Sequence, residues 1–168
     1  MLRAAGIVAL IVLTACGQNT PTTVASPSPV IAQGNWVQNL KFTGELSGVM
    51  SGIVANTGDQ KNECSGLKAR SGQEWADTFF GTIDVSSNVW EVNFHIATFR
   101  GPGSYTAADV TVEVNSPDKS KVWQSRGSDK VTFTMDHSQQ AGTLTADVTN
   151  AVTGLPGLKV TGEWHCKG

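Results

Sequence analysis

Three histidines are the residues that metal or acid–base chemistry would need first. His95 and His165 fall on outward faces of predicted strands by alternation, and His137 lies beside Asp136 at the end of an inward face. A metal or acid–base site needs two or more such groups that converge, and these lie on separate strands without ligand spacing. We therefore expect no metal site and interpret the histidines as solvated or rim residues.

Several aspartates lie near the ends of predicted strands, where a pair could form a carboxylate dyad or a calcium site: Asp84, Asp109, Asp136 and Asp147. No calcium-loop spacing connects them, and aspartates at strand ends usually cap turns. The chain has no Gly-x-Ser-x-Gly elbow and no glycine loop that leads into a helix. We predict no catalytic residues and no cofactor. The alternative is an envelope hydrolase with a site assembled from dispersed residues, such as Asp136 and His137 with another acid.

Five tryptophans are the next candidates for a function. Trp90 and Trp164 fall on core faces, whereas the positions of Trp75 and Trp123 are less determined. Exposed aromatic rings can stack on sugar rings, so Trp75 and Trp123 are candidate contact residues of a carbohydrate-binding module. The alternative is that they are core residues.

The segment 99–105 is the most distinctive part of the domain. Its sequence Phe-Arg-Gly-Pro-Gly-Ser-Tyr contains glycines that suit a tight turn with positive φ. We interpret it as a rigid corner. The alternative is that Arg100 and Tyr105 line a contact surface.

The elements that must position these residues are β-strands. Alternation of apolar and polar residues, with turn residues between the runs, predicts strands over 40–54, 75–85, 89–99, 109–115, 121–126, 130–137, 142–150 and 159–166. The first run is long for one strand, so its glycines predict a bend or bulge. About eight strands and no helix indicate an all-β antiparallel sandwich, Ig-like or related, or a flattened barrel. An apolar-ligand carrier remains an alternative unless core aromatic residues fill the interior.

The N-terminal sequence indicates export. A single Arg3 precedes an apolar run over 4–12, which is too short to span a bilayer as a helix. The run ends in Leu13-Thr14-Ala15-Cys16, which resembles the lipobox of bacterial lipoproteins. The resemblance implies cleavage before Cys16, diacylglyceryl and palmitate-type acylation of that cysteine, and life at a membrane surface. The alternative is an ordinary cleaved signal peptide with an incidental cysteine.

With Cys16 assigned to the lipid, two cysteines remain in an oxidising compartment. We therefore predict a disulfide between Cys64 and Cys166. The alternative is two free thiols, one of them a nucleophile or metal ligand.

The segments around the domain follow from composition. Residues 1–15 are predicted as signal peptide, 16–35 as a lipidated flexible spacer rich in Ser, Thr and Pro, and 36–168 as one β-sandwich domain. The formal net charge is −2 and no basic patch stands out, which argues against a nucleic-acid partner.

This architecture resembles that of small surface lipoprotein antigens of actinobacteria. The matching features are the lipobox, the spacer over 20–29, Cys64 and the terminal Trp164-His165-Cys166. The resemblance implies a binding or antigenic role without catalytic residues. We therefore expect a lipid-anchored protein on the outer face of the cytoplasmic membrane or the cell surface. Its expected partners are the membrane, through Cys16, and a protein, glycan or lipid.

Overall fold

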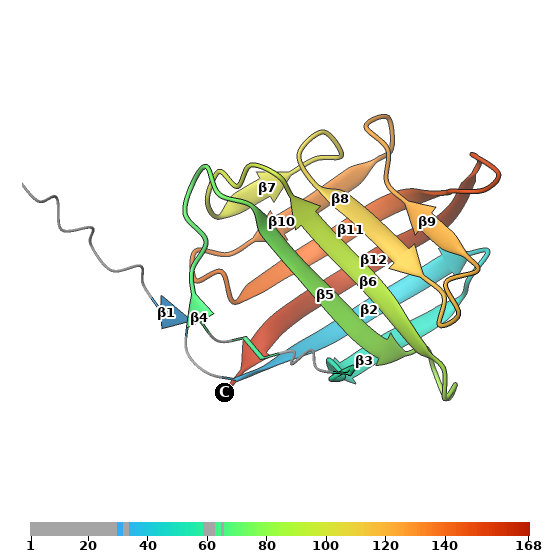
Figure 1. Cartoon of the computed structure of the whole chain (residues 1–168), viewed down its shortest axis with the longest axis horizontal. Coiled ribbons are helices and arrows are strands. Elements are labelled where there is room, and N and C mark those ends of the chain that lie inside the picture. The colour runs from blue at the N-terminus through green and yellow to red at the C-terminus, as the bar shows by residue number, and fades with distance from the viewer. Residues whose placement is uncertain (1–29, 32–33, 59–62, 65) are drawn as a thin grey trace, which may run out of the picture.

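The computed structural model describes residues 30–31, 34–58, 63–64 and 66–168 (Figure 1). The predicted signal peptide, Cys16 and most of the predicted spacer therefore lie outside the described residues. Within the described ranges the chain forms twelve strands and no helix. Ten of these strands belong to one antiparallel sheet, and β1 (Val30–Ile31) pairs separately with β4 (Gly66–Leu67).

The large sheet follows the order β3, β2, β12, β11, β9, β8, β6, β5, and β10 extends from β11 to β7. The strands are β2 (Asn35–Gly44), β3 (Gly48–Ile53), β5 (Trp75–Thr82), β6 (Val89–Ile96), β7 (Gly103–Tyr105), β8 (Thr111–Asn115), β9 (Val122–Gln124), β10 (Val131–Met135), β11 (Ala141–Asn150) and β12 (Pro156–Lys167). The long β11 pairs with β10 over its first half and with β9 at its end. This branching lets one sheet turn around the core.

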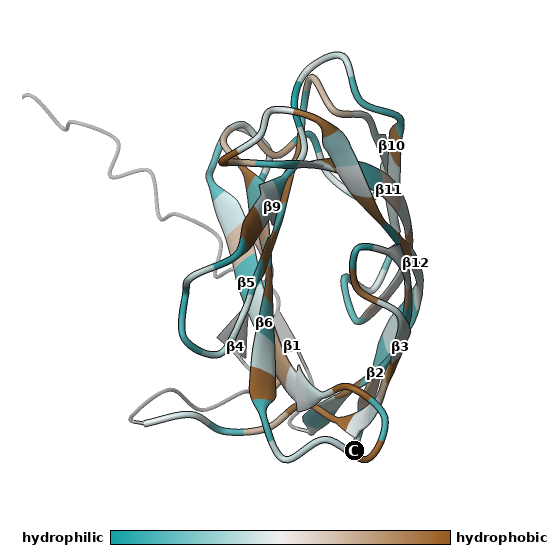
Figure 2. Ribbon diagram, turned by 90° about the vertical axis from the view of Figure 1, so that its right-hand side faces the viewer, coloured by the Kyte–Doolittle hydropathy of each residue, from teal (hydrophilic) through white to brown (hydrophobic). Residues whose placement is uncertain are grey.

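The two edges of the sheet, β3 and β5, almost meet. A bridge joins Met50 to Ile83, and the Asp84 N–H donates to the Val49 carbonyl at 2.9 Å. Further along the seam, the Phe80 carbonyl accepts hydrogen bonds from the buried Gln38 amide at 2.9 Å and from the Ala55 N–H at 3.0 Å. Figure 2 shows the rolled sheet from the side, with two faces around the interior. The predicted all-β antiparallel fold is confirmed, and its form is that of a nearly closed, flattened barrel.

Aromatic side chains fill the interior of this barrel. The Phe94, Phe133 and Trp164 rings contact one another with centroid distances between 4.8 and 5.6 Å. Each ring comes from a different strand and is at most 2% exposed. Alternation places them inward, and burial of rings of this size is a dominant stabilising term.

The run 40–54 is two strands rather than one bent strand. The chain reverses between Gly44 and Gly48, whose φ angles of 119° and 138° suit glycine. Apolar residues stay in register across the reversal because Leu40 pairs with Met50. Another glycine, Gly142 on β11, leaves room for a tryptophan, because a Cβ there would lie 2.2 Å from the Trp164 ring.

Candidate functional site

The two ends of the barrel differ in what they carry. β2 begins at Asn35 beside Cys166 and Lys167 of β12, so both the entry of the domain and its C-terminus lie at one end (Figure 1). We call this the proximal end. β2, β5, β8 and β11 finish at the opposite, distal end, which consists of the loops 45–47, 83–88, 116–121 and 151–155. Five large apolar side chains are exposed among the described residues, and four of them lie at or beside these distal loops: Val85, Val89, Val152 and Leu155.

A surface hollow of about 330 Å³ opens at the distal end, between the start of β6 and the turn that joins β8 to β9. We call it the Trp90 hollow, and it is lined by Asn88, Trp90, Ser116, Pro117, Asp118, Ser120 and Lys121. All of the chain's aromatic side chains lie in the described residues, and only Trp75 and Trp90 remain partly exposed. The hollow thus combines a partly exposed aromatic ring with amide, hydroxyl, carboxylate and ammonium groups.

A fixed second ring supports Trp90 from inside. The Trp123 ring lies 6.3 Å from the Trp90 ring between centroids and is 1% exposed. Its Nε1–H donates to Glu45 Oε2 at 2.8 Å, and the Asn150 amide donates to the same oxygen at 2.9 Å. Hydrogen bonds from Asn150 and then Trp123 lower the pKa of Glu45, so this acceptor is ionised at neutral pH. These contacts hold the floor of the hollow in one position.

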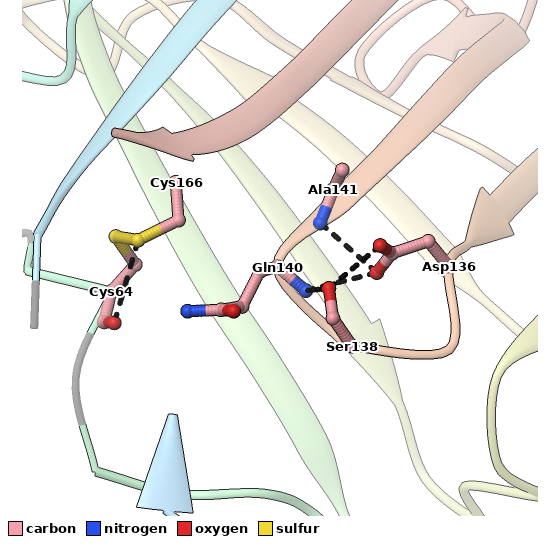
Figure 3. Close-up of a disulfide and its surroundings, with 6 residues drawn as sticks. All are labelled: Cys64, Asp136, Ser138, Gln140, Ala141 and Cys166. Carbon is pink, nitrogen blue, oxygen red and sulfur yellow. Dashed lines mark hydrogen bonds between the residues drawn. A yellow bond between two sulfur atoms is a disulfide. The ribbon is translucent and has the colours of Figure 1, made fainter. Parts of the chain in front are cut away.

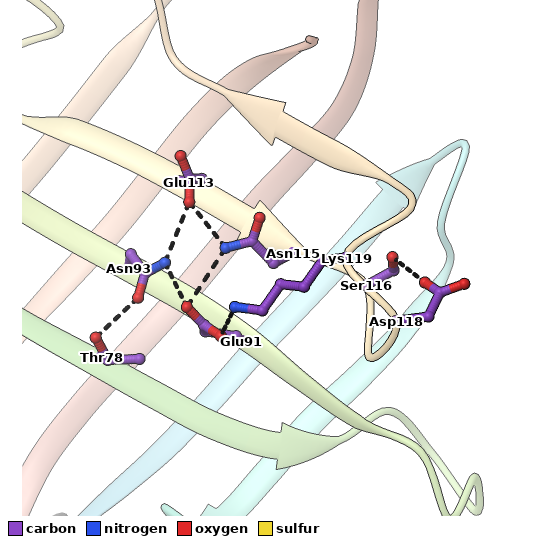
Figure 4. Close-up of polar contacts among 8 residues, drawn as sticks. All are labelled: Thr78, Glu91, Asn93, Glu113, Asn115, Ser116, Asp118 and Lys119. Atoms are coloured by element: carbon purple, nitrogen blue, oxygen red, sulfur yellow. Dashed lines mark hydrogen bonds and ion pairs between the residues drawn. The ribbon is translucent and has the colours of Figure 1, made fainter. Parts of the chain in front are cut away.

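The polar wall of the hollow is a tight turn organised by Asp118. Asp118 Oδ1 accepts a hydrogen bond from Ser116 Oγ at 2.6 Å (Figure 4). The same oxygen accepts from Ser120 Oγ at 2.8 Å and from the Ser120 N–H at 3.1 Å. Hydrogen bonds from Ser116 and then Ser120 lower the pKa of Asp118 to about 2. Within the described part of the chain, no hydrogen bond ends on Oδ2. The turn therefore presents a fixed carboxylate with one free oxygen.

The outer face of β5, β6 and β8 carries a connected polar network (Figure 4). The Asn93 amide donates to Glu91 at 2.8 Å and to Glu113 at 3.3 Å, and the Asn115 amide donates to Glu113 at 2.8 Å. Lys119 forms an ion pair with Glu91. Burial raises the pKa of Glu91, but hydrogen bonds from Lys119 and Asn93 outweigh it, and the pKa is lowered overall. The Asn93 and Asn115 amides thus lie between the Glu91 and Glu113 carboxylates, and their hydrogen bonds offset the repulsion between the two charges.

A second hollow, of about 320 Å³, lies between this network and the first hollow. It shares Asn88, Ser116 and Pro117 with the Trp90 hollow and is reached by the Glu91–Lys119 pair. The two hollows therefore flank one rigid turn at the distal end.

The predicted disulfide lies at the proximal end (Figure 3). Cys64 and Cys166 are bonded, with Cα atoms 5.7 Å apart, which confirms the prediction. The Cys64 N–H donates to the Gly34 carbonyl at 2.9 Å, and the Cys166 N–H donates to the Gln140 carbonyl at 2.7 Å. The bond therefore fastens the last strand to the connection between β3 and β5.

Asp136 caps the turn beside this disulfide (Figure 3). Its carboxylate accepts from Ser138 Oγ at 2.6 Å and from the Gln140 and Ala141 N–H groups at 3.0 and 3.2 Å. Burial raises its pKa, but these hydrogen bonds, led by that of Ser138, lower it overall. A hollow of about 370 Å³ includes Asp136 with Glu163 and His165, and His137 does not line it. The Asp136 carboxylate therefore caps the turn after β10, as aspartates at strand ends commonly do.

Arg100 and Tyr105 form the predicted corner. The Tyr105 hydroxyl donates to the Gly101 carbonyl at 2.5 Å and accepts from the Arg100 N–H at 3.0 Å, and the ring is 1% exposed. The Arg100 guanidinium lies 5.1 Å from that ring and 2.7 Å from Asp109. Arg100 thus links Tyr105 to Asp109. Tyr105 is buried, whereas the side chains of Arg100 and Asp109 are 57% and 24% exposed. The φ angles of Gly101 and Gly103 are positive, as a tight turn requires, and the segment also contains the short strand β7, which the sequence did not predict.

The structure separates the two tryptophans that the sequence proposed as ligand contacts. Trp123 offers no exposed ring face because it is buried, and Trp75 is half-buried at the proximal end against Phe133, at 5.4 Å. Trp90, which alternation assigned to the core, is partly exposed and lines the hollow at the distal end. Trp90 is the second residue of β6, and this position near the end of a strand was the sequence signal for partial exposure.

His95 and His165 are exposed, as alternation predicts. His137 is exposed as well, in the turn after β10 rather than at the end of an inward face. His95 pairs with Glu74 at 3.0 Å. Within the described ranges, no group of three or more His, Cys, Asp or Glu residues is arranged to hold a metal ion. The same part of the chain contains no helix long and apolar enough to cross a bilayer.

In comparisons with known proteins, no family model matches this chain and no curated sequence matches it.

Proposed function

We propose that this chain is an exported, lipid-anchored protein that acts by binding at the cell envelope, without catalysis. The observation that carries the proposal is the Cys64–Cys166 disulfide, because such bonds persist in oxidising compartments outside the cytoplasm. The lipobox-like Leu13-Thr14-Ala15-Cys16 supplies the anchor in this proposal, and acylation takes place at Cys16.

The side chains of the domain support binding better than hydrolysis. Asp109, Asp118 and Asp136 each accept hydrogen bonds within a turn, and those bonds lower the pKa of each carboxyl. A general acid needs the opposite shift, which Asp77 has, but Asp77 does not line either distal hollow. The packed rings of Phe94, Phe133 and Trp164 also occupy the space that an apolar-ligand carrier would need. The distal hollows offer an open surface where a ligand can contact the protein.

Fractionation of cells that express the full chain tests the anchor. The wild-type protein is expected in the membrane fraction, and the Cys16→Ser protein is expected to lose the lipid and leave that fraction. Thr20→Ser, a change in the predicted spacer, is the matched control and should fractionate as wild type. Equal membrane retention of the Cys16→Ser protein would overturn the proposal.

A further inference from the structure

We propose that the Trp90 hollow binds one sugar ring of a neutral glycan. The inference rests on the proposed envelope-binding function and names the class of ligand and the site. It depends on three properties of the hollow: its aromatic floor, its fixed polar groups and its balanced charge.

The aromatic floor suits the apolar face of a sugar. A pyranose presents a face of C–H groups, which packs against an aromatic ring, while its hydroxyls remain free to form hydrogen bonds at the edge. Trp90 is half-buried, so part of its ring stays open to the hollow. Trp123, anchored to Glu45 at 2.8 Å, holds that ring from behind. The ring is therefore in place before a ligand arrives, which lowers the entropic cost of binding.

The polar rim supplies both hydrogen-bond donors and hydrogen-bond acceptors for the hydroxyl groups of a sugar. Asn88 is exposed and offers an amide donor and an amide acceptor. Asp118 offers Oδ2 as an acceptor, since the three hydrogen bonds of the turn end on Oδ1. Lys121 is exposed on the same rim and donates. Because Asp118 and Lys121 are the two charged residues in the lining, their charges offset each other and favour an uncharged ligand.

The size and place of the hollow fit a ring at the end of a longer chain. A volume of about 330 Å³ lies near the lower limit of small-molecule sites, roughly 300–1,000 Å³, so it accommodates one ring rather than several. The hollow lies among the distal loops 83–88 and 116–121, whereas β2 begins with Asn35 at the proximal end. A domain tethered through its N-terminal segment would thus point this site away from its anchor.

Titration of the purified full chain with neutral oligosaccharides tests the proposal. The probes are cellohexaose, xylohexaose, mannohexaose and maltohexaose, and the readout is the shift of the Trp90 indole N–H signal in NMR spectra. We expect saturable binding of at least one probe. Sorbitol, which has hydroxyls but no ring face, should not bind. Absence of binding by all four probes up to about 10 mM, roughly tenfold above a Kd of 1 mM, would overturn the proposal.

Three variants locate the site. Asn88→Ala leaves the core untouched and should weaken the affinity about fivefold, the value of one hydrogen bond. Trp90→Leu keeps an apolar side chain without the aromatic face and should weaken it about tenfold or more. Trp75→Leu changes the other half-buried tryptophan, at the proximal end, and should leave the affinity unchanged. Equal binding by wild type, Asn88→Ala and Trp90→Leu would contradict the assignment.

Separate experiments test the glycan site and the proposed lipid anchor, so each can fail without the other. The titration uses purified protein and does not depend on the anchor, whereas fractionation of the Cys16→Ser protein does not depend on sugar. A protein that is lipidated but binds none of the four probes would refute only the proposal of glycan binding. A sugar-binding protein without lipid at Cys16 would refute the anchor alone.

Discussion

Replacing Asp77 with asparagine should stabilise the protein at alkaline pH and leave its stability unchanged in acid. Asp77 lies on β5 between the inward-facing Trp75 and Phe79, at the edge of the sheet. Its carboxyl accepts one hydrogen bond within the described residues, from the Thr78 N–H at 2.8 Å. Burial raises the pKa of Asp77 to about 7, from an ordinary value of 3.8, and the Thr78 hydrogen bond opposes this only in part. The folded state therefore prefers the neutral acid.

The sign and size of the effect follow from this shift. Below pH 3.8 the carboxyl is protonated in the folded and unfolded chain, so its full stabilising contribution is present. As pH rises towards about 7, only the unfolded chain ionises freely, and stability is lost until the folded carboxyl ionises as well. A shift of about three pKa units corresponds to roughly 4 kcal/mol at most. Because Asp77 keeps some solvent exposure, we expect about 2 kcal/mol.

Urea unfolding followed by tryptophan fluorescence measures this effect at pH 3.5 and pH 8 with the disulfide intact. Asp77→Asn preserves the acceptor for the Thr78 N–H and mimics the neutral acid. The variant should exceed the wild type by about 2 kcal/mol at pH 8 and match it at pH 3.5. Asp147→Asn, on the outward face of β11, is the matched control and should not show this pH-dependent gain. An Asp77→Asn difference that is absent or independent of pH would refute the reasoning.

Three further changes test the packing. Cys64→Ser combined with Cys166→Ser opens a loop of 102 residues and should lower the free energy of unfolding by about 4 kcal/mol, measured by urea titration; an unchanged midpoint would contradict the role of the bond. Gly142→Ala places a Cβ 2.2 Å from Trp164 and should cost about 3 kcal/mol in the same assay, whereas Gly127→Ala, with nothing within 4 Å, should cost less than about 1 kcal/mol. Tyr105→Phe removes two buried hydrogen bonds and should lower the thermal midpoint by an amount equivalent to about 1–2 kcal/mol, and wild-type stability would exclude a structural corner.

Sequence alternation predicted much of the strand pattern because each strand has one buried face. β6 illustrates this, since Val92, Phe94 and Ile96 are fully buried and His95 is exposed, as the period of two requires. Alternation does not reveal which strands pair, so the closure of β3 against β5 through Met50 and Ile83 could not be predicted. That contact depends on how far the whole sheet twists and rolls.

The candidate site was harder to predict from the sequence than the strands, for a related reason. Alternation correctly turns Trp90 inward, but it carries no information about where along the barrel axis an inward side chain lies. At the middle of a strand such a ring is buried, as Phe94 is, whereas at the end of the barrel it remains partly open. Trp123 is buried instead, because its Nε1–H donates to Glu45, which lies in another loop 78 residues away in sequence. Such long-range partners depend on the tertiary fold.

The central claim, that this is an exported protein anchored by lipid, is tested most directly by intact mass spectrometry of the full chain recovered from membranes. The account predicts a chain that begins at Cys16, carries a diacylglyceryl group with fatty acid, and lacks two hydrogens because Cys64 and Cys166 are bonded. A chain that retains residues 1–15, or that begins elsewhere without lipid and with both thiols free, would contradict it.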